Sequence, residues 1–543
     1  MKNLFFILLI THCSLLIINA QTKFQRTIGG TGEDHAWSIR QTTDGGYAVA
    51  GFTYSFGAGS SDFYIVKLSG ADGSLQWSRT FGGAGTDIAL SMKLTSDGGY
   101  VMSGETDSFG AGGNDAIFVM IDSTGALQWK RTFGGLYEDY GECIIVTSDG
   151  GYAVGGYTNS FGAGDFDQYI AKFDSGGLFQ WMRTIGGTGY DYALCIIQTT
   201  DTGYALAGST SAFGEGYTDF YVVKLNSIGA LEWSRTFGGA GGDYCSYIIQ
   251  TTDGGYILAG VTITFGIGWY DIYIVKLDGN GSLQWSRTIG GTNFEYLYSI
   301  IQTTDGGCAI AGSTLSYGAG GYDVYVLKFD GSGNLQWNRT IGGTGDEFAR
   351  SIIQTTDGGY ALTGETQSFG AGNNDMYVVK LDAAGNTCGN TFSPAPVTGT
   401  GGTLGYPASI INTPVPTVTT LTGTTGTGGT LTTICVVGIQ PITNEIPKSY
   451  SLFQNYPNPF NPSTKIRFDI PVGTRQGVFV QLIVFDVLGK VIEILVNEQL
   501  QPGTYEIDWS APTGDAAKYS SGVYFYKIIS GTYSETKKMV LLK

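Results

Sequence analysis

The sequence predicts an all-β protein: a seven-bladed β-propeller, with four strands per blade, followed by a small β-sandwich. Three observations support this fold class. Glycine supplies 86 of the 543 residues while charged residues are only 14%, against average shares of ~7% and ~25%. Tryptophan recurs at a fixed interval along much of the chain. Aromatic residues reach 13%, too many for a disordered chain, so the glycines are expected in the turns of a strand-rich fold.

Residues 1–20 have the features of a secretory signal peptide. A basic start and an apolar run precede small residues, which predicts cleavage between Ala20 and Gln21. The alternative, an uncleaved membrane anchor, is disfavoured because His12 and Asn19 interrupt a stretch that is barely long enough to span a bilayer. We therefore expect a secreted or surface-attached protein without a transmembrane span.

A sequence unit repeats seven times in the middle of the chain. A strict period near 50 residues indicates stacked supersecondary units. Arg26 begins the series, with Phe24 at its tryptophan position, and an Asp-Gly-Gly or Asp-Thr-Gly turn occurs in every unit. The six tryptophans, each followed by Arg-Thr two positions later and spaced 52 residues apart, are Trp77, Trp129, Trp181, Trp233, Trp285 and Trp337.

Each unit contains four short apolar runs separated by Gly, Asp, Asn and Thr turns. In one unit the runs are residues 192–199, 204–210, 219–225 and 230–237. Such runs are typical of a four-stranded antiparallel blade, and their lack of polar alternation favours sheets covered on both faces. Seven such blades form a propeller.

The two ends of the repeat predict how the ring closes. Residues 23–30 have the sequence of a fourth strand, whereas the last unit, 347–383, stops after its third strand. The N-terminal strand is therefore predicted to complete the seventh blade, which leaves no open sheet edge. An open solenoid is the competing architecture.

The repeat W-x-R-T-x-G-G…D-G-G-Y…D-x-Y-x-V-K-L-D resembles the β-propeller repeat of many secreted bacterial proteins, which places the propeller at residues 21–383. That repeat family implies no single activity. The piece K-L-D-x-x-G-x-L-x-W is also similar to the docking motif of quinoprotein propellers. Those proteins have eight blades and a dedicated cofactor site, neither of which is found in this sequence, so no cofactor is expected.

Residues 448–543 are predicted to form the sandwich, with strands separated by Asn-Pro, Pro-Gly and Ser-Gly turns. The segments YSLFQNYPNPFNPSTKIRFDI, SSGVYFYKI and TKKMVLLK resemble the type A C-terminal sorting domain of type IX secretion. The resemblance implies export across the outer membrane of a Bacteroidetes-type bacterium by the type IX secretion machinery. It also implies a recognition surface on the terminal strand, around Lys537, Lys538, Met539, Val540 and Leu541.

Residues 384–447 are rich in Thr, Gly and Pro and are interpreted as a linker that builds no core of its own. Cys388 and Cys435 bracket it, and export makes a disulfide between them plausible. Four further cysteines lie in apolar strands and are expected to be small buried residues: Cys143, Cys195, Cys245 and Cys308.

The composition excludes several function classes. Only two histidines occur, and one leaves with the signal peptide, which argues against zinc clusters and His-based catalysis. The formal net charge of -17 argues against nucleic acid or anionic membrane as a partner. Seven carboxylates at the start of the innermost strands admit a cation, but capping of the adjacent Gly-Gly amides is the favoured interpretation, so no metal is expected: Asp34, Asp87, Asp139, Asp191, Asp243, Glu295 and Glu347.

Residues that differ between blades are the better candidates for an asymmetric site. The longer loops share one face, and aromatic residues gather in those of the third to sixth units. The candidates for ligand binding are Phe166, Tyr190, Tyr217, Trp269, Tyr270, Phe294 and Tyr322. Their packing onto the glycine-rich loops is the alternative.

We therefore expect a monomeric, non-catalytic binding or adhesion protein, secreted or on the cell surface, with an extracellular glycan or protein as ligand. One alternative is an extracellular polysaccharide-processing enzyme, for which the blade-specific carboxylates are Glu105, Glu142, Glu215 and Glu365 and the remaining histidine is His35. The other alternative is a purely structural surface protein.

Overall fold

The computed structural model describes residues 23–388, the strands between residues 391 and 437, and residues 447–542 with gaps at 462, 472–477, 501, 511–520 and 532. These residues form two compact units, Thr22–Val437 and Gly438–Lys543. Across the described ranges there is no helix with the length and hydropathy needed to cross a membrane. The predicted signal peptide and its cleavage site at Ala20 and Gln21 lie outside the described residues.

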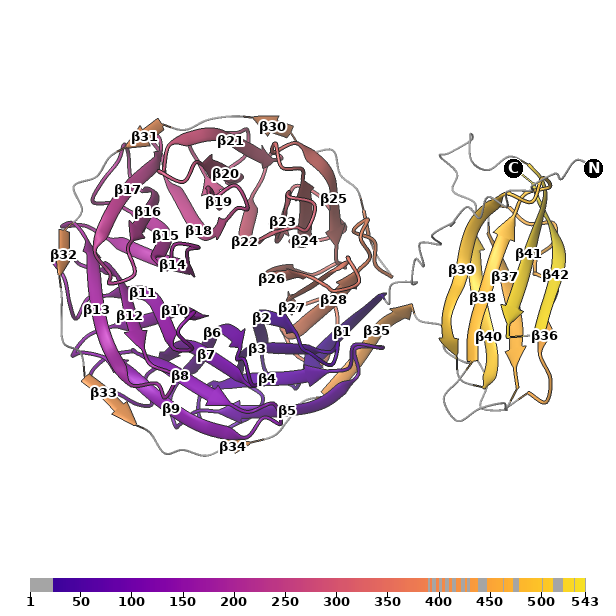
Figure 1. Cartoon of the computed structure of the whole chain (residues 1–543), viewed down its shortest axis with the longest axis horizontal. Coiled ribbons are helices and arrows are strands. Elements are labelled where there is room, and N and C mark those ends of the chain that lie inside the picture. Colours follow the sequence, from indigo (N-terminus) through magenta and orange to yellow (C-terminus); the bar gives the residue numbers. More distant parts are fainter. Residues whose placement is uncertain are drawn as a thin grey trace, which may run out of the picture. The chain divides into compact units, whose positions relative to one another are not determined.

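Seven antiparallel sheets stand around a common axis, as the sequence predicts (Figure 1). The strands nearest the axis are β2 (Asp34–Gln41), β6 (Asp87–Leu94), β10 (Asp139–Val146), β14 (Asp191–Gln198), β18 (Asp243–Gln250), β22 (Glu295–Gln302) and β26 (Glu347–Gln354). The second strands are β3 (Tyr47–Thr53), β7 (Tyr100–Thr106), β11 (Tyr152–Thr158), β15 (Tyr204–Thr210), β19 (Tyr256–Thr262), β23 (Cys308–Thr314) and β27 (Tyr360–Thr366).

The third and fourth strands complete each blade. The third strands are β4 (Asp62–Leu68), β8 (Asp115–Ile121), β12 (Asp167–Phe173), β16 (Asp219–Leu225), β20 (Asp271–Leu277), β24 (Asp323–Phe329) and β28 (Asp375–Leu381). The fourth strands are β5 (Leu75–Phe81), β9 (Leu127–Gly134), β13 (Phe179–Gly186), β17 (Leu231–Gly238), β21 (Leu283–Gly290), β25 (Leu335–Ile341) and, in blade 7, β1 (Lys23–Gly29).

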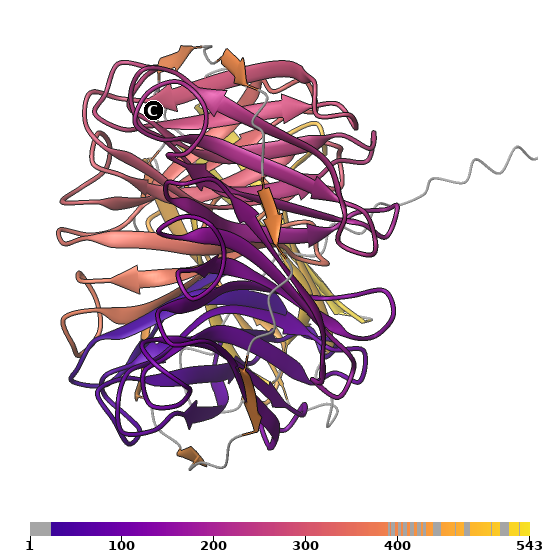
Figure 2. The same ribbon diagram turned by 90° about the vertical axis from the view of Figure 1, so that its left-hand side faces the viewer.

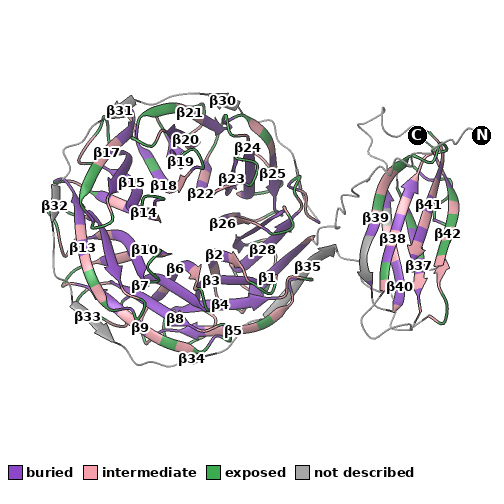
Figure 3. Cartoon of the chain, in the orientation of Figure 1, coloured by how far each residue is buried: buried purple, intermediate pink, exposed green. Residues whose placement is uncertain are grey.

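Burial follows the position of a strand in its blade (Figure 3). Every residue of β4, β12 and β16 is buried, because neighbouring blades cover both faces of the sheet. In blades 1 to 6 the fourth strands are exposed or half-buried at their first three residues and mostly buried beyond them, as in β13. In blade 7, β1 is buried from Phe24 onward. The uniform apolar runs of the sequence therefore mark the middle of each blade.

The repeated Trp, Arg and Gly positions link one blade to the next. The Arg183 guanidinium lies 5.2 Å from the centre of the Trp181 ring, a cation–π contact that recurs from blade to blade. The same ring packs under Gly229, in the turn between the third and fourth strands of the next blade. Gly229 has a φ of +77°, and a Cβ there would meet Trp181 at 3.0 Å. The position therefore requires glycine.

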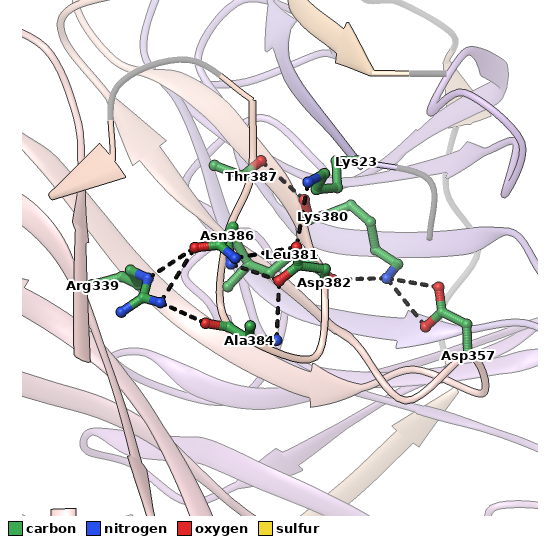
Figure 4. A network of polar contacts seen from close by, with 9 residues as sticks. All are labelled: Lys23, Arg339, Asp357, Lys380, Leu381, Asp382, Ala384, Asn386 and Thr387. Atoms are coloured by element: carbon green, nitrogen blue, oxygen red, sulfur yellow. Dashed lines mark hydrogen bonds and ion pairs between the residues drawn. The ribbon is translucent and has the colours of Figure 1, made fainter. Parts of the chain in front are cut away.

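The N-terminal strand closes the ring, as predicted. β1 pairs antiparallel with β28, so that Phe24 lies opposite Lys380. At this junction the Lys23 ammonium is 3.3 Å from the Asp382 carboxylate, and the Thr387 hydroxyl donates to the Lys380 carbonyl over 3.0 Å (Figure 4). The first and last segments of the repeat are thus held together by both backbone and side-chain contacts.

A fifth strand lies on the outer edge of every blade, which the interpretation of residues 384–447 as a mere linker did not anticipate. We call these seven strands the belt. They follow the ring backwards, from blade 6 through blade 1 to blade 7, along its outer surface (Figure 2): β29 (Thr391–Phe392), β30 (Val397–Gly399), β31 (Thr403–Gly405), β32 (Ile410–Asn412), β33 (Thr417–Thr420), β34 (Thr425–Gly426) and β35 (Thr430–Val437).

The belt pairs through the backbone. β35 pairs with β1 over the whole of Lys23–Gly29, whereas the other belt strands pair over two to four residues. An outer strand carries unpaired N–H and C=O groups, and any extended segment can satisfy them. Pairing of this kind requires no apolar pattern, which explains why the composition of the segment did not predict it.

The C-terminal unit contains two sheets around one hydrophobic core, in agreement with the predicted small β domain. One sheet is formed by β36 (Ser451–Leu452), β37 (Ser463–Ile470) and β40 (Gly503–Ser510). The other has the order β39 (Val491–Leu500), β38 (Val478–Phe485), β41 (Gly522–Ser530) and β42 (Tyr533–Leu541). Alternate residues of β37 are buried, which is the pattern of a sheet with one face on a core.

Candidate ligand-binding face

Two sets of loops meet on one face of the propeller, which we call the loop face. They are the loops between the second and third strands and the loops that lead into each innermost strand. The Asp191 amide donates to the Phe166 carbonyl over 2.8 Å, and the Glu295 amide donates to the Tyr270 carbonyl over 2.9 Å. The equivalent bond occurs at every junction between blades. This bond holds the loop-face side chains of adjacent blades side by side.

The carboxylates at the start of the innermost strands cap the loops that precede them. The Gly187 amide donates to Asp191 over 2.8 Å, and the Gly291 amide donates to Glu295 over 2.8 Å. All seven of these carboxylate residues are fully buried. The described residues contain no group of His, Cys, Asp and Glu side chains able to hold a metal ion. The same bond from a glycine amide to the carboxylate occurs in all seven blades, so the capping that the sequence favoured is present in each.

Aromatic side chains on the loop face form two clusters. The first aromatic cluster, on blades 3 and 4, comprises Tyr140, Tyr157, Phe166, Tyr190 and Tyr192. The second aromatic cluster, on blades 5 to 7, comprises Tyr244, Trp269, Tyr270, Phe294, Tyr296, Tyr298, Tyr322 and Phe348. Thr218 and Gly242 occupy the equivalent positions at the junction between blades 4 and 5, where the two clusters are separated.

Six of the seven predicted aromatic residues join these clusters. Phe166, Phe294 and Tyr322 are half-buried by their neighbours, so part of the aromatic surface does pack locally. Tyr217 is 81% exposed and is not part of either cluster. Trp269 is 69% exposed, yet its ring stacks on Phe294 with centroids 6.0 Å apart and an interplanar angle of 19°.

The geometry around Trp269 is concave. A surface cavity of about 390 Å³ is lined by Ile263, Ile267, Gly268, Trp269, Tyr270 and Thr292. Its walls come from the loop between β19 and β20 and from the loop that leads into β22. An indole that is held by stacking and faces such a cavity provides a fixed apolar platform.

The sequence analysis missed the contribution of the innermost strands. The second residue of each strand points toward the loop-face clusters in blades 3 to 7: Tyr140, Tyr192, Tyr244, Tyr296 and Phe348. The same position holds His35 in blade 1 and Ile88 in blade 2. Aligning the seven units at their first carboxylate would have revealed this run of aromatic residues.

Two of the blade-specific carboxylates lie close together beside the first aromatic cluster. Burial, followed by the charges of Glu138 and Asp107, raises the pKa of Glu105 to about 7. Burial and the charge of Glu105 raise the pKa of Glu142 to about 8. Sequence spacing gave no reason to pair these residues, because they belong to adjacent blades. Near neutral pH at least one of the two carboxyl groups holds a proton and can donate a hydrogen bond.

His35 and Glu365 hold blades 1 and 7 together. The His35 Nδ1 atom contacts the Glu365 carboxylate, and the Arg350 guanidinium is 2.5 Å from the other oxygen of that carboxylate. Burial alone would raise the pKa of Glu365, but His35 and Arg350 lower it below its usual range. Arg350 also lies 4.1 Å from the Tyr298 ring centre. His35 thus has a partner that the sequence did not reveal, in a contact between blades.

The structure places Cys388 in a disulfide. The side chain of Cys435 lies outside the described residues, although its backbone pairs with Gln25 in β1. The Gln25 side chain in turn contacts the Cys388 carbonyl. The pairing of Cys388 with Cys435 therefore stays a prediction. Cys143, Cys195, Cys245 and Cys308 are free and buried, as expected.

The terminal strand β42 lies at the edge of its sheet. Met539 and Leu541 are fully buried in the core, whereas Lys538 is exposed and Lys537 and Val540 are half-buried. The Asn-Pro-rich segment that precedes β37 covers part of this edge. The Phe460 amide donates to the Val540 carbonyl over 2.9 Å, and the Leu542 amide donates to the Phe460 carbonyl over 2.9 Å. Of the five residues predicted for recognition, three are therefore accessible in the folded domain.

Comparison with known proteins identifies this C-terminal unit. Residues 454–542 match the family described as "Secretion system C-terminal sorting domain". This segment is a sorting domain. The domain directs the protein through the type IX secretion machinery to the cell surface or the surrounding medium.

Two further comparisons give weaker similarities. The protein is 25% identical over 189 residues to the "Regulatory protein FlaEY" of Caulobacter vibrioides, a match that covers 32% of this chain and 20% of that protein. A solved structure of the trimeric ectodomain of the C. elegans fusion protein EFF-1, truncated at its C-terminus, aligns with 83% of this chain and 96% of its own. Its identity of 6% and TM-score of 0.13 carry no structural argument.

Proposed function

We propose that the propeller is a non-catalytic binding module that attaches to an extracellular glycan through the second aromatic cluster. The observation that carries this proposal is Trp269, which is largely exposed but held by stacking on Phe294 beside a surface cavity. Sugar rings present apolar C–H faces that stack on fixed aromatic rings, and a preorganised platform loses little entropy on binding. Adhesion of the exported protein to a polysaccharide follows from such binding.

Glycan-array binding by the mature protein, followed by titration of the best ligand, tests the proposal. Trp269→Ala and Tyr270→Ala are expected to weaken binding by at least tenfold, while the melting temperature changes little. Tyr54→Ala is the matched control, because Tyr54 is 47% exposed on blade 1 and belongs to neither cluster. Absence of binding to any glycan would contradict the proposal and favour a purely structural surface protein. Equal affinity of Trp269→Ala and the unmodified protein would place the site elsewhere.

The second candidate function is polysaccharide processing, which the proximity of Glu105 and Glu142 favours. A protonated carboxyl beside an ionised one is the arrangement that acid–base cleavage of a glycosidic bond requires. Reducing-end release from polysaccharides by the mature protein is the measurement. Loss of that release in Glu142→Gln, with retained binding, would support an enzyme. Binding without any release would support the non-catalytic module.

A further inference from the structure

A second site with a different chemistry lies on the propeller axis. All seven innermost strands contribute to a cavity of about 410 Å³. The seventh residues of the seven innermost strands form one ring around this cavity. In blades 3 to 7 that residue is isoleucine, whereas blades 1 and 2 have Arg40 and Lys93: the isoleucines are Ile145, Ile197, Ile249, Ile301 and Ile353. Two adjacent cations thus interrupt an otherwise apolar ring.

These two half-buried cations differ from six of the seven fully buried lysines in the described part of the propeller; the seventh, Lys130, lies over the Phe109 ring. Lys67, Lys172 and Lys224 each lie 2.9 Å from an aspartate of the neighbouring turn, and the same pair recurs in blades 5 to 7. Within the described part of the chain, neither Arg40 nor Lys93 forms an ion pair with a carboxylate. The Arg40 Nη1 atom donates to the Ile39 carbonyl over 2.6 Å, which is a neutral partner.

One thiol close to the two cations offsets their charge in part. A hydrogen bond with Cys195, against the effect of burial, and then the charges of Lys93 and Arg40 lower the pKa of Cys143 to about 6. Burial and then the neighbouring charge of Arg40 lower the pKa of Lys93 to about 8, and burial lowers the pKa of Arg40. The groups close to them are the thiols of Cys143 and Cys195 and the hydroxyl of Tyr247. These residues occupy the fifth position of their innermost strands, where blades 1, 2, 6 and 7 have serine. Glu142 also lines the cavity, but its pKa of about 8 leaves it largely protonated at neutral pH.

Arg40 and Lys93 are half-buried in this cavity, and neither has a carboxylate partner there, so their partial desolvation is a cost that a bound anion would offset. Guanidinium and ammonium groups donate charge-assisted hydrogen bonds to the oxygens of sulfate, phosphate and carboxylate, and low local polarity strengthens these bonds. We propose that the axial cavity binds an oxyanionic group, either a free ion or part of an acidic sugar, between Arg40 and Lys93. This site is separate from the second aromatic cluster and does not depend on the proposed glycan binding there.

The test titrates the mature protein with inorganic sulfate and phosphate at constant ionic strength set by chloride, and follows heat release and melting temperature. A saturable response is expected. Arg40→Ile and Lys93→Ile copy the residue found in the other five blades, so both variants should fold and melt above the unmodified protein without ligand. Each is expected to weaken sulfate binding by at least tenfold. Arg287→Met, which removes a cation stacked on Trp285, is the matched control and should bind normally.

Two further arms complete the experiment. Glucuronate and galactose sulfate distinguish the sources of the anion: tighter binding than inorganic sulfate assigns an acidic sugar, and equal or weaker binding assigns a free ion. Trp269→Ala should leave the sulfate response unchanged, which separates this site from the proposed glycan site. No saturable response in the unmodified protein, or the same response in the Arg40→Ile, Lys93→Ile double variant, would overturn the proposal.

Discussion

The propeller contains two kinds of position, those that are the same in every blade and those that differ, and they lie in different places. The shared positions are caps, turn glycines and the stacked Trp–Arg pairs, as in Asp191, Gly229 and Arg183. The differing positions gather on the loop face and along the axis, as in Trp269 and Lys93. Sevenfold repetition cannot by itself build an asymmetric site, so selective binding must use the positions that differ.

Removal of the disulfide at Cys388 is expected to have the largest effect. Cys388 is not part of the repeat, yet its loss should change stability and leave binding intact. If Cys435 is its partner, the closed loop spans about 47 residues, and the loop-entropy estimate is about 4 kcal/mol. Cys388→Ser and Cys435→Ser should then lower the free energy of unfolding equally, and the double variant should lower it no further. Denaturant unfolding measures this, and added reductant should affect only the unmodified protein. Unequal effects of the single variants would exclude this pairing.

A shared position should affect stability and leave binding intact. Asp87 accepts hydrogen bonds from the Gly83 amide at 2.8 Å and the Ser108 hydroxyl at 2.7 Å. Asp87→Ala leaves a half-buried amide and a half-buried hydroxyl without their acceptor, which is expected to cost about 2–3 kcal/mol. Ser108→Ala removes the bond to Asp87 and also the acceptor of the Gly85 amide, and should cost about 1–2 kcal/mol. Glycan affinity should stay the same in both, and a change in affinity would break the distinction between the two kinds of position.

The buried carboxylates predict how stability depends on pH. Burial, followed by the charge of Asp243, raises the pKa of Asp219 to about 7, and burial raises the pKa of Asp191 to about 6. A raised carboxyl pKa means that the folded state binds the proton more tightly, so stability should fall as pH rises from about 4 to 7. The expected loss is about 2 kcal/mol. Asp219→Asn should flatten this slope in melting curves, and an unchanged slope would contradict the assignment.

The aspartates in the turns on the opposite face of the propeller make stability depend on pH in the opposite sense. Partial burial opposes the shift, but hydrogen bonds from Thr147 and Lys172 lower the pKa of Asp149 to about 2. Asp201 and Asp253 also have pKa values of about 2. Their contribution is present above the ordinary aspartate pKa of about 4 and is lost as pH falls from there toward 2. The melting temperature should therefore pass through a maximum in mildly acidic solution.

The smallest effect concerns one blade that departs from a shared turn. Thr202 has a φ of +66°, where the other six blades have glycine with similar positive values. A β-branched residue is strained in this conformation, so Thr202→Gly should stabilise the protein by about 0.5–1 kcal/mol. The reciprocal change, Gly150→Thr, should destabilise it by a similar amount through backbone strain alone, since a Cβ at Gly150 would meet no atom within 4 Å. Denaturant midpoints compare the pair, and stabilisation by both changes would contradict a strained turn.

The sequence by itself determined the blades, their number, the closing strand and the sorting domain. Each of these depends on local turn chemistry repeated at a fixed period, or on motifs contiguous in the chain, as with Asp-Gly-Gly and Trp-x-Arg. It also located most of the loop-face aromatic residues, because these interrupt a regular pattern.

Only the tertiary structure decided which differing residues meet. Glu105 approaches Glu142, His35 approaches Glu365, and Arg40 approaches Lys93 because adjacent blades bring positions far apart in sequence to one face or one axis. The belt likewise depends on exposed backbone edges rather than on side-chain periodicity. Contacts between residues that differ from blade to blade, and pairing through the backbone, leave no pattern in the sequence, whereas turns and buried strands do.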